Sequence, residues 1–300
     1  MSEWNLRILE SPAEMGEVEE LQRLVWPGNE TEIVPAHLLL AAVRGGGLVI
    51  GAFDKAALPR LIGFVFGFPG FYLTPDGPRL KHCSHMLGVR PDCRDHGLGY
   101  ALKRAQWQMV RHQGLDRVTW TYDPLLSRNA HLNIAKLGVV CNTYHREYYG
   151  EMRDGLNVGL ASDRFEVDWW VNTHRVERRL SRRVRPSLDL AHCFEAGAHI
   201  VNPTTIDVAG WSRPPSLPSP LPPTPRGMTE REGNILLVEI PADFLALKAA
   251  DPALALQWRM HGRALFEALF ERGYLVTDFV YLSAEHPRSF YVLTHGASTL

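Results

Sequence analysis

Polar and apolar positions change their period several times along the chain. Residues 5–9 alternate, which predicts a short strand, and residues 12–25 then carry apolar side chains at helical spacing. Ser11 and Pro12 precede this run and are typical of a helix start. A second helix is predicted from near Pro35 to the three glycines at 45–47. The chain therefore begins with one strand and two helices.

The same pattern predicts a mixed sheet over the next part of the chain. Its expected strands and helices follow one another in the order β-β-β-α-β-α-β-β. The strands are expected at 48–53, 61–68, 82–89, 117–122, 139–144 and 165–171, and the helices at 100–112 and 130–137. Because several strands follow one another without a helix between them, a simple doubly wound sheet is excluded. The fold class predicted is α+β, with a mixed sheet.

The composition changes after residue 171. Six arginines lie in one short segment: Arg175, Arg178, Arg179, Arg182, Arg183 and Arg185. Val176, Leu180 and Val184 recur among them at helical spacing, which favours a solvated amphipathic helix over an RNA-binding segment. Residues 212–226 then hold seven of the chain's 21 prolines, which is typical of an extended spacer or a surface loop.

The last part of the chain is predicted to form a compact β-α-β-β unit. A strand is expected at 234–240, a helix from Asp251-Pro252 to Gly273, and strands at 274–282 and 289–293. We therefore divide the chain into residues 1–171, a connector at 172–226, and a unit at 227–300. The last unit faintly resembles the strand-helix-strand of the first part, and a degenerate duplication is one interpretation.

Charge and cysteine content exclude several classes of function. With 22% charged residues and a net charge of −1, no overall field would attract nucleic acid or an anionic membrane. The four cysteines are scattered, which argues against a disulfide framework or a structural zinc site. No signal peptide and no apolar run long enough to span a bilayer is visible. We expect a cytoplasmic protein without nucleic-acid or membrane partners.

The most informative segment follows the strand predicted at 82–89. It reads Arg94-Asp95-His96-Gly97-Leu98-Gly99 and stands where a helix is expected to begin. Glycine lets the main chain approach an anion closely, and free amides at a helix start donate to phosphate oxygens. A Rossmann site is disfavoured because the third glycine is missing and the strand ends several residues earlier. The segment is therefore interpreted as a pyrophosphate-binding loop.

This loop, after Val89-Arg90-Pro91, resembles the coenzyme A signature of the GNAT superfamily of acetyltransferases. The segment from Asn129 to Gly138 is similar to that family's helix ending in Lys-Leu-Gly-Phe. Three further segments look like an uncharacterised bacterial GNAT branch with a C-terminal extension: 85–89, 120–125 and 162–165. The resemblance implies a GNAT-like acyl-CoA N-acyltransferase fold and acetyl-CoA as the acyl donor.

The resemblance also implies where the cofactor binds. The fourth and fifth strands would splay apart, with the pantetheine arm between them. The backbone of Leu87, Gly88 and Val89 would hold that arm, and one N–H there would stabilise the oxyanion. Arg94, Asp95, His96, Gly97, Leu98 and Gly99 would bind the pyrophosphate. Asn129 resembles the polar contact to pantetheine, although Asn133 or Ser127 could take that place.

Direct attack by an amine needs a base and an acid. His85 is the first candidate for the base, with His82 and Asp123 as alternatives, and each of these has a structural role as its competing interpretation. The tyrosine that the family uses as the acid is replaced by Ile134. Tyr148 is our candidate for the acid; Tyr144, Tyr149 or solvent could also serve.

The expected acceptor is a primary amine, on a small molecule or on a protein. The spacing of His82 and His85 on a strand puts them on opposite faces, so no metal site is expected. A non-catalytic, CoA-binding regulatory or scaffold protein is the alternative function, because the usual acid is missing. The C-terminal unit could mediate a homodimer or close over the acceptor site.

Overall fold

The computed structural model describes residues 4–27, 30–150, 159–181, 189–216 and 235–295. These residues form two compact units. The first contains residues 4–120 and 169–177, and the second contains residues 121–150, 159–168 and the described residues from 178 onward. Three elements contribute residues to both units: β5 (Arg117–Tyr122), β7 (Arg164–Trp170) and α5 (His174–Leu180).

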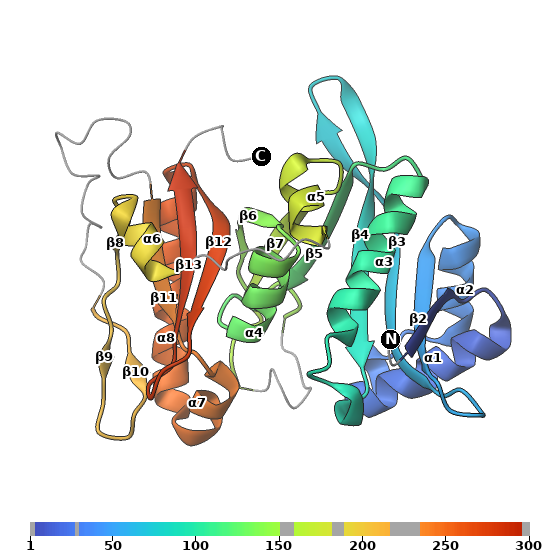
Figure 1. Cartoon of the computed structure of the whole chain (residues 1–300), viewed down its shortest axis with the longest axis horizontal. Coiled ribbons are helices and arrows are strands. Elements are labelled where there is room, and N and C mark those ends of the chain that lie inside the picture. The colour runs from blue at the N-terminus through green and yellow to red at the C-terminus, as the bar shows by residue number, and fades with distance from the viewer. Residues whose placement is uncertain (1–3, 28–29, 151–158, 182–188, 217–234, 296–300) are drawn as a thin grey trace. The chain divides into compact units, whose positions relative to one another are not determined.

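The first unit is built on a sheet with the strand order β1-β2-β3-β4-β5 (Figure 1). Its first four strands are β1 (Trp4–Ile8), β2 (Leu48–Asp54), β3 (Leu61–Thr74) and β4 (Gly77–Val89). Neighbours among these four are antiparallel, whereas β4 and β5 are parallel. The sheet is therefore mixed, as predicted.

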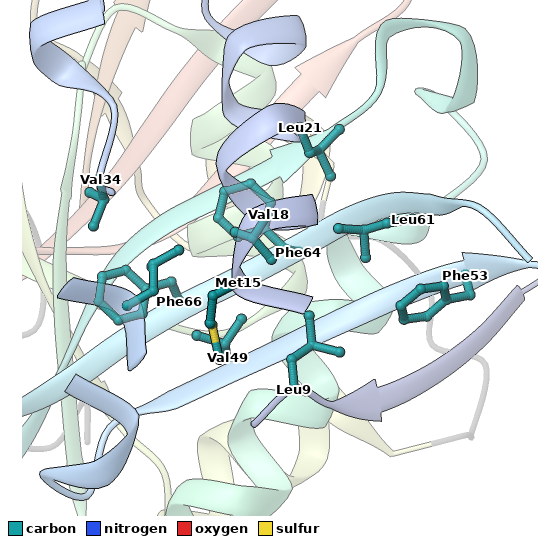
Figure 2. Packing of buried hydrophobic residues seen from close by; sticks show 11 residues of the cluster. Leu9, Met15, Val18, Leu21, Val34, Val49, Phe53, Leu61, Phe64 and Phe66 are labelled. Carbon is teal, nitrogen blue, oxygen red and sulfur yellow. The ribbon is translucent and has the colours of Figure 1, made fainter. Parts of the chain in front are cut away.

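Helices cover both faces of this sheet because successive strand residues point to opposite sides. On one face, α1 (Pro12–Val25) and α2 (Ala36–Arg44) enclose a core that Figure 2 shows at close range. Its buried residues are Leu9, Met15, Val18, Leu21, Val34, Leu39, Val49, Phe53, Leu61, Phe64 and Phe66. On the other face, α3 (Leu98–His112) buries Leu98 and Leu102 against Ile50, Ile62 and Val65.

Local signals explain where the first helix begins. The Ser11 hydroxyl accepts from the Glu14 backbone N–H, and the Glu14 carboxylate accepts from the Ser11 backbone N–H, which together form a capping box. Pro12 occupies the first turn, where it lacks only an N–H that the helix does not use. Two short 3₁₀ turns complete the unit, η1 (Glu30–Glu32) and η2 (Pro91–Cys93).

The second unit has its own run of strands, in the order β7-β6-β12-β13-β11-β8. Apart from β7, these are β6 (Val140–His145), β8 (His199–Ile200), β11 (Ile235–Ile240), β12 (Tyr274–Leu282) and β13 (Arg288–His295). The short strands β9 (Thr205–Ile206) and β10 (Ser212–Arg213) pair separately. Its helices are α4 (Ser127–Ala130), the π-helix η3 (His131–Lys136), α6 (Leu190–Glu195), α7 (Phe244–Ala250) and α8 (Pro252–Glu271).

Aromatic side chains form the centre of the second unit. Phe266 of α8 lies 4.8 Å from Phe165 of β7 and 5.4 Å from Tyr291 of β13, measured between ring centroids, and both contacts are edge-to-face. All three residues are fully buried. Such pairs stabilise by about 0.5–1.5 kcal/mol beyond the area they bury. These contacts join α8 to β7, which precedes it in the sequence, and to β13, which follows it.

The structure confirms the predicted order of elements from residue 5 to 171, which is the order that the GNAT resemblance implies. β3 and β4 are longer than predicted, because they continue into a hairpin with Thr74 paired to Gly77. Val276 of β12 pairs with Cys141 of β6, so strands from the predicted first and third regions share a sheet within the second unit. The division at 171 and 226 remains a prediction.

The C-terminal β-α-β-β unit is present, with α7 as an additional helix before α8. In the arginine-rich segment, α5 buries Val176 and Leu180, as expected for an amphipathic helix. Val184, Arg182, Arg183 and Arg185 lie outside the described residues, as does most of the proline-rich stretch.

Candidate functional site

The predicted pyrophosphate loop ends in an uncapped helix start. Gly97 is the N-cap of α3 and takes a left-handed conformation with φ 83°, which glycine adopts without strain. The first bond of the helix runs from the Ala101 N–H to the Gly97 carbonyl at 3.1 Å. The amides of Leu98, Gly99 and Tyr100 precede that bond, and Gly97 has no side chain to cap them. Together with the helix dipole, these amides suit an anion.

The loop before this helix start is open to solvent. Arg94, Asp95, His96 and Gly97 are all exposed. The Nε atom of Arg94 donates to the Val89 carbonyl at 3.2 Å, which holds this side chain beside the end of β4. A guanidinium there can form charge-assisted bonds to phosphate. The six predicted loop residues are thus continuous: Arg94 to Gly97 lie between β4 and α3, and Leu98 and Gly99 are the first two residues of α3.

β4 contains a bulge next to this loop. Phe66 of β3 pairs with Met86, and the next residue, Gly67, pairs with Ser84, so His85 is an extra residue in β4. On its other side, β4 pairs with β5 through His82–Val118 and Cys83–Thr119. Within the described residues this ladder does not extend to Leu87–Val89. In the part of the chain that the structure describes, the pairing of β4 with β5 therefore ends at Cys83–Thr119.

The side chains of Ser84 and His85 point to opposite faces of the sheet, as those of neighbouring strand residues do. The His85 ring lies 5.9 Å from the ring of Phe66 and 5.8 Å from that of Phe68, on the side covered by α1 and α2. His85 is exposed, and partial desolvation by its surroundings lowers its pKa. Ser84 instead faces α3. The predicted base thus stands at the bulge with a neutral imidazole at pH 7.

Behind Ser84 lies a buried polar cluster that sequence reasoning missed. Lys103 Nζ donates to Ser84 Oγ at 2.8 Å and to Gln106 Oε1 at 3.1 Å, and Gln106 Nε2 lies 3.1 Å from His82 Nε2. The four residues are at most 6% exposed. We call Ser84, His82, Lys103 and Gln106 the β4–α3 cluster. Gln106 interrupts the series Leu98, Leu102, Val110 at spacing four, which is the sequence signal that could have revealed it.

Burial shifts the pKa values of this cluster. Desolvation lowers the pKa of Lys103 to about 7. Desolvation, followed by the nearby charge of Lys103, lowers the pKa of His82 to about 4. His82 is therefore neutral at physiological pH, and its Nδ1 atom has no hydrogen-bond partner among the described residues. His82 and His85 lie on opposite faces, as predicted.

In the second unit, Asp123 forms a buried ion pair with Arg259. Arg259 Nη1 donates to Asp123 Oδ1 at 2.9 Å, and Nη2 donates to Oδ2. Asp123 Oδ1 also accepts from the Leu125 backbone N–H at 2.9 Å. Both carboxylate oxygens are thus occupied, which favours the turn-capping role that was the alternative for Asp123.

The three candidate tyrosines occupy different environments in the same unit. The Tyr144 hydroxyl donates to Asp163 Oδ2 at 2.7 Å, and Arg263 donates to both oxygens of Asp163. Burial and this carboxylate raise the pKa of Tyr144. The Tyr149 hydroxyl lies 2.9 Å from Thr121 Oγ1. Tyr148 is 45% exposed, with its ring 4.8 Å from that of Tyr149.

The predicted pantetheine contacts lie where α4 changes into a π-helix. Asn129 is half-buried in α4 and Asn133 is buried in η3. Ser127, the other alternative, already shares a 2.7 Å hydrogen bond with Ser289. Single π-turns recur at functional sites, so this helix fits the role given to Asn129. Ile134, at the expected position of the acid, is fully buried.

Nowhere in the described residues do three His, Cys, Asp or Glu side chains gather closely enough to hold a metal ion. None of their helices is both long and apolar enough to cross a bilayer.

Comparisons with known proteins give matches at the level of structure. No protein-family model and no curated protein matches the sequence. The chain is similar to NAA60 from Arabidopsis thaliana in complex with acetyl-CoA, with a TM-score of 0.45 and 16% identity over 56% of this chain and 99% of that one. It is also similar to the ribosomal-protein-S18-alanine N-acetyltransferase from Escherichia coli (TM-score 0.43, 12% identity, 61% and 99% covered) and to an aminoglycoside 6'-acetyltransferase type Ii (TM-score 0.43, 16%, 57% and 99%).

Proposed function

We propose that this protein is an acyl-CoA-dependent N-acyltransferase of the GNAT type, which transfers an acetyl group from acetyl-CoA to a primary amine. The observation that carries this proposal is the exposed, uncapped start of α3 at Gly97, directly after a strand whose pairing with its parallel neighbour ends at Cys83. The first feature suits a pyrophosphate and the second offers free backbone groups to a pantetheine arm. Gly97 and the residues of β4 beyond Cys83 belong to the first unit.

Cofactor binding would use main-chain groups. The amides of Leu98, Gly99 and Tyr100 would donate to the pyrophosphate, with Arg94 adding a charged contact. The backbone of Leu87–Val89 would pair with the pantetheine amides as a strand would. One N–H of this stretch would stabilise the oxyanion, a contribution of about 10²–10³ in rate.

His85 is the proposed base. It stands at the bulge, on the face opposite α3, and its lowered pKa keeps the imidazole able to accept a proton at pH 7. The base would take a proton from the acceptor amine as its nitrogen attacks the thioester carbon. The C–S bond then breaks and the sulfur of CoA takes a proton. Tyr148 remains a prediction for the group that gives this proton.

The test is the release of free thiol from acetyl-CoA across a panel of small amines and peptides with free amino groups. Turnover with any acceptor supports the proposal, and a His85→Gln variant should lose about 10²–10⁴ in kcat/KM while its CoA affinity is retained. Lys55→Met, which changes an exposed residue in the turn after β2, is the matched control. Tight CoA binding without turnover for any acceptor would favour a regulatory or scaffold protein instead.

A further inference from the structure

The β4–α3 cluster lies at the point where the pairing of β4 with β5 ends. Cys83–Thr119 is the last pair of their ladder, and Ser84 is the next residue of β4. Ser84 therefore stands at the first position of the stretch of β4 that does not pair with β5 and that the proposed function gives to pantetheine. Its hydroxyl is 2.8 Å from Lys103 Nζ, within the distance at which a proton can pass between the two groups.

The hydrogen bonds of Lys103 fix the orientation of its neighbours. Its ammonium group donates to Ser84 Oγ and Gln106 Oε1 and lies 3.7 Å from the centroid of the Trp120 ring. Because an ammonium is only a donor, Gln106 must turn its oxygen toward Lys103. Its Nε2 then faces His82 Nε2, which must accept. His82 is thus held neutral, with its proton on Nδ1.

His82 therefore does not compete for the proton of Lys103. When Lys103 is neutral, its lone pair can accept the proton that the Ser84 hydroxyl otherwise donates to Gln106 Oε1 at 3.1 Å. Ser84 and Lys103 can thus exist as a pair in two states, with Lys103 charged or neutral, that differ by one proton. Burial of all four side chains excludes water from this exchange. These are the properties of an acid–base pair that is oriented by a third group.

We propose that Ser84 and Lys103 form a proton relay that protonates the departing thiolate of coenzyme A. This inference rests on the proposed acyl transfer. As the C–S bond breaks, the sulfur takes the hydroxyl proton of Ser84, and Ser84 Oγ takes a proton from the Lys103 ammonium. Lys103 is left neutral and takes up a proton from solvent once the products have left, while His85 releases the proton of the amine to solvent, so the protons balance. No other reactant is needed.

The two proton transfers then take place on opposite faces of β4. His85 is placed to take a proton from the amine on the side of α1 and α2, and Ser84 is placed to give one on the side of α3. The lowered pKa of Lys103, about 7, matches an acid that must release its proton and recover it at neutral pH. The relay takes the role of the acid, for which Tyr148 is the candidate from the sequence because Ile134 replaces the family tyrosine.

The direct test follows Lys103 itself, by NMR titration of its ¹³Cε resonance in the full-length protein. The two ligands are CoA and desulfo-CoA, which lacks only the sulfur. In the CoA complex the thiol and Lys103 are linked through Ser84 and titrate as a coupled pair, so the midpoint observed for Lys103 should differ by at least about 0.5 pH unit between the two complexes. Identical titrations in the two complexes would overturn the relay while leaving the proposed function intact. No binding of CoA would overturn both.

Kinetics provide a second readout. Ser84→Ala should lower kcat by about 10²-fold with the Kd for CoA changed less than about threefold, since it removes an acid and no cofactor contact. In the wild type kcat should fall as pH rises through the ionisation of Lys103, and Lys103→Met should abolish this fall. A Ser84→Ala enzyme with wild-type kcat and an unchanged pH profile would contradict the relay.

Discussion

Gly67 of β3 lies directly against the imidazole of His82 in β4. A Cβ atom on Gly67 would overlap His82 Nε2 and lie 2.6 Å from the Cys83 carbonyl oxygen. His82 Nε2 is also the atom that faces Gln106. The absence of a side chain at position 67 therefore lets the histidine reach the β4–α3 cluster.

Gly67→Ala should lower the free energy of unfolding by about 1–3 kcal/mol, because the added methyl group forces His82 away from Gln106. Gly16→Ala is the control: a Cβ there meets nothing within 4 Å, and alanine favours the helix by about 0.5–1 kcal/mol. Urea unfolding should thus show opposite signs for the two variants. Equal stability of Gly67→Ala and the wild type would contradict the packing described.

The Gly97→Ala variant tests the role of the loop, because it adds backbone strain without a steric clash. Gly97 has φ 83° with open space around its Cβ position, so alanine should cost about 1–2 kcal/mol of stability without a clash. Gly114, at the other end of α3, has φ 76° and equally open surroundings. Both variants should lose similar stability, whereas isothermal titration should show weakened CoA binding for Gly97→Ala only. Equal CoA affinities of the two variants would show that the loop is not part of the CoA-binding site.

Breaking the ion pair between Asp123 and Arg259, which lies far from the loop in sequence, should lower the stability of the protein strongly. Arg259→Met leaves a buried carboxylate without its partner, which should cost about 3–5 kcal/mol in urea unfolding. Arg60→Met breaks the exposed pair with Asp54 and should cost no more than about 1 kcal/mol. Similar losses in the two variants would show that the ion pair of Asp123 is not a structural anchor.

Lys103 predicts a dependence of stability on pH. Its pKa is about 7 in the folded protein and 10.5 ordinarily. Between pH 7 and pH 10.5 the unfolded chain therefore binds more protons than the folded protein does. The penalty for burying the charge is complete below pH 7 and is relieved as pH rises. From pH 7 to 9 the wild type should gain about 2–3 kcal/mol relative to Lys103→Met. Parallel stability curves would show that Lys103 titrates normally.

The fold and the loop were predictable because their signals are local. Ser11, Pro12 and the glycines at 97 and 99 act within one or two turns of chain, and the continuous apolar runs of β2 and β3 fit strands that are buried on both faces. The bulge at His85 carries no such signal, because it depends on the register between two strands. Arg259 and Asp123 are 136 positions apart, so their pairing follows from tertiary structure alone.

The cluster around Lys103 was missed for a related reason. Lys103 and Gln106 look like solvent-facing residues of an amphipathic helix until β4 supplies Ser84 and His82 as partners. The interruption of the apolar series at Gln106 was visible, but the residue that it contacts was not.

The central claim is that the start of α3 binds the pyrophosphate of acetyl-CoA. Its most direct test is a titration of the ¹⁵N-labelled protein with acetyl-CoA, using pantetheine, which lacks the pyrophosphate, as the control ligand. We predict that the amide resonances of Leu98, Gly99 and Tyr100 shift strongly with acetyl-CoA and remain unchanged with pantetheine. Unchanged resonances at these three amides in the presence of saturating acetyl-CoA would contradict the account.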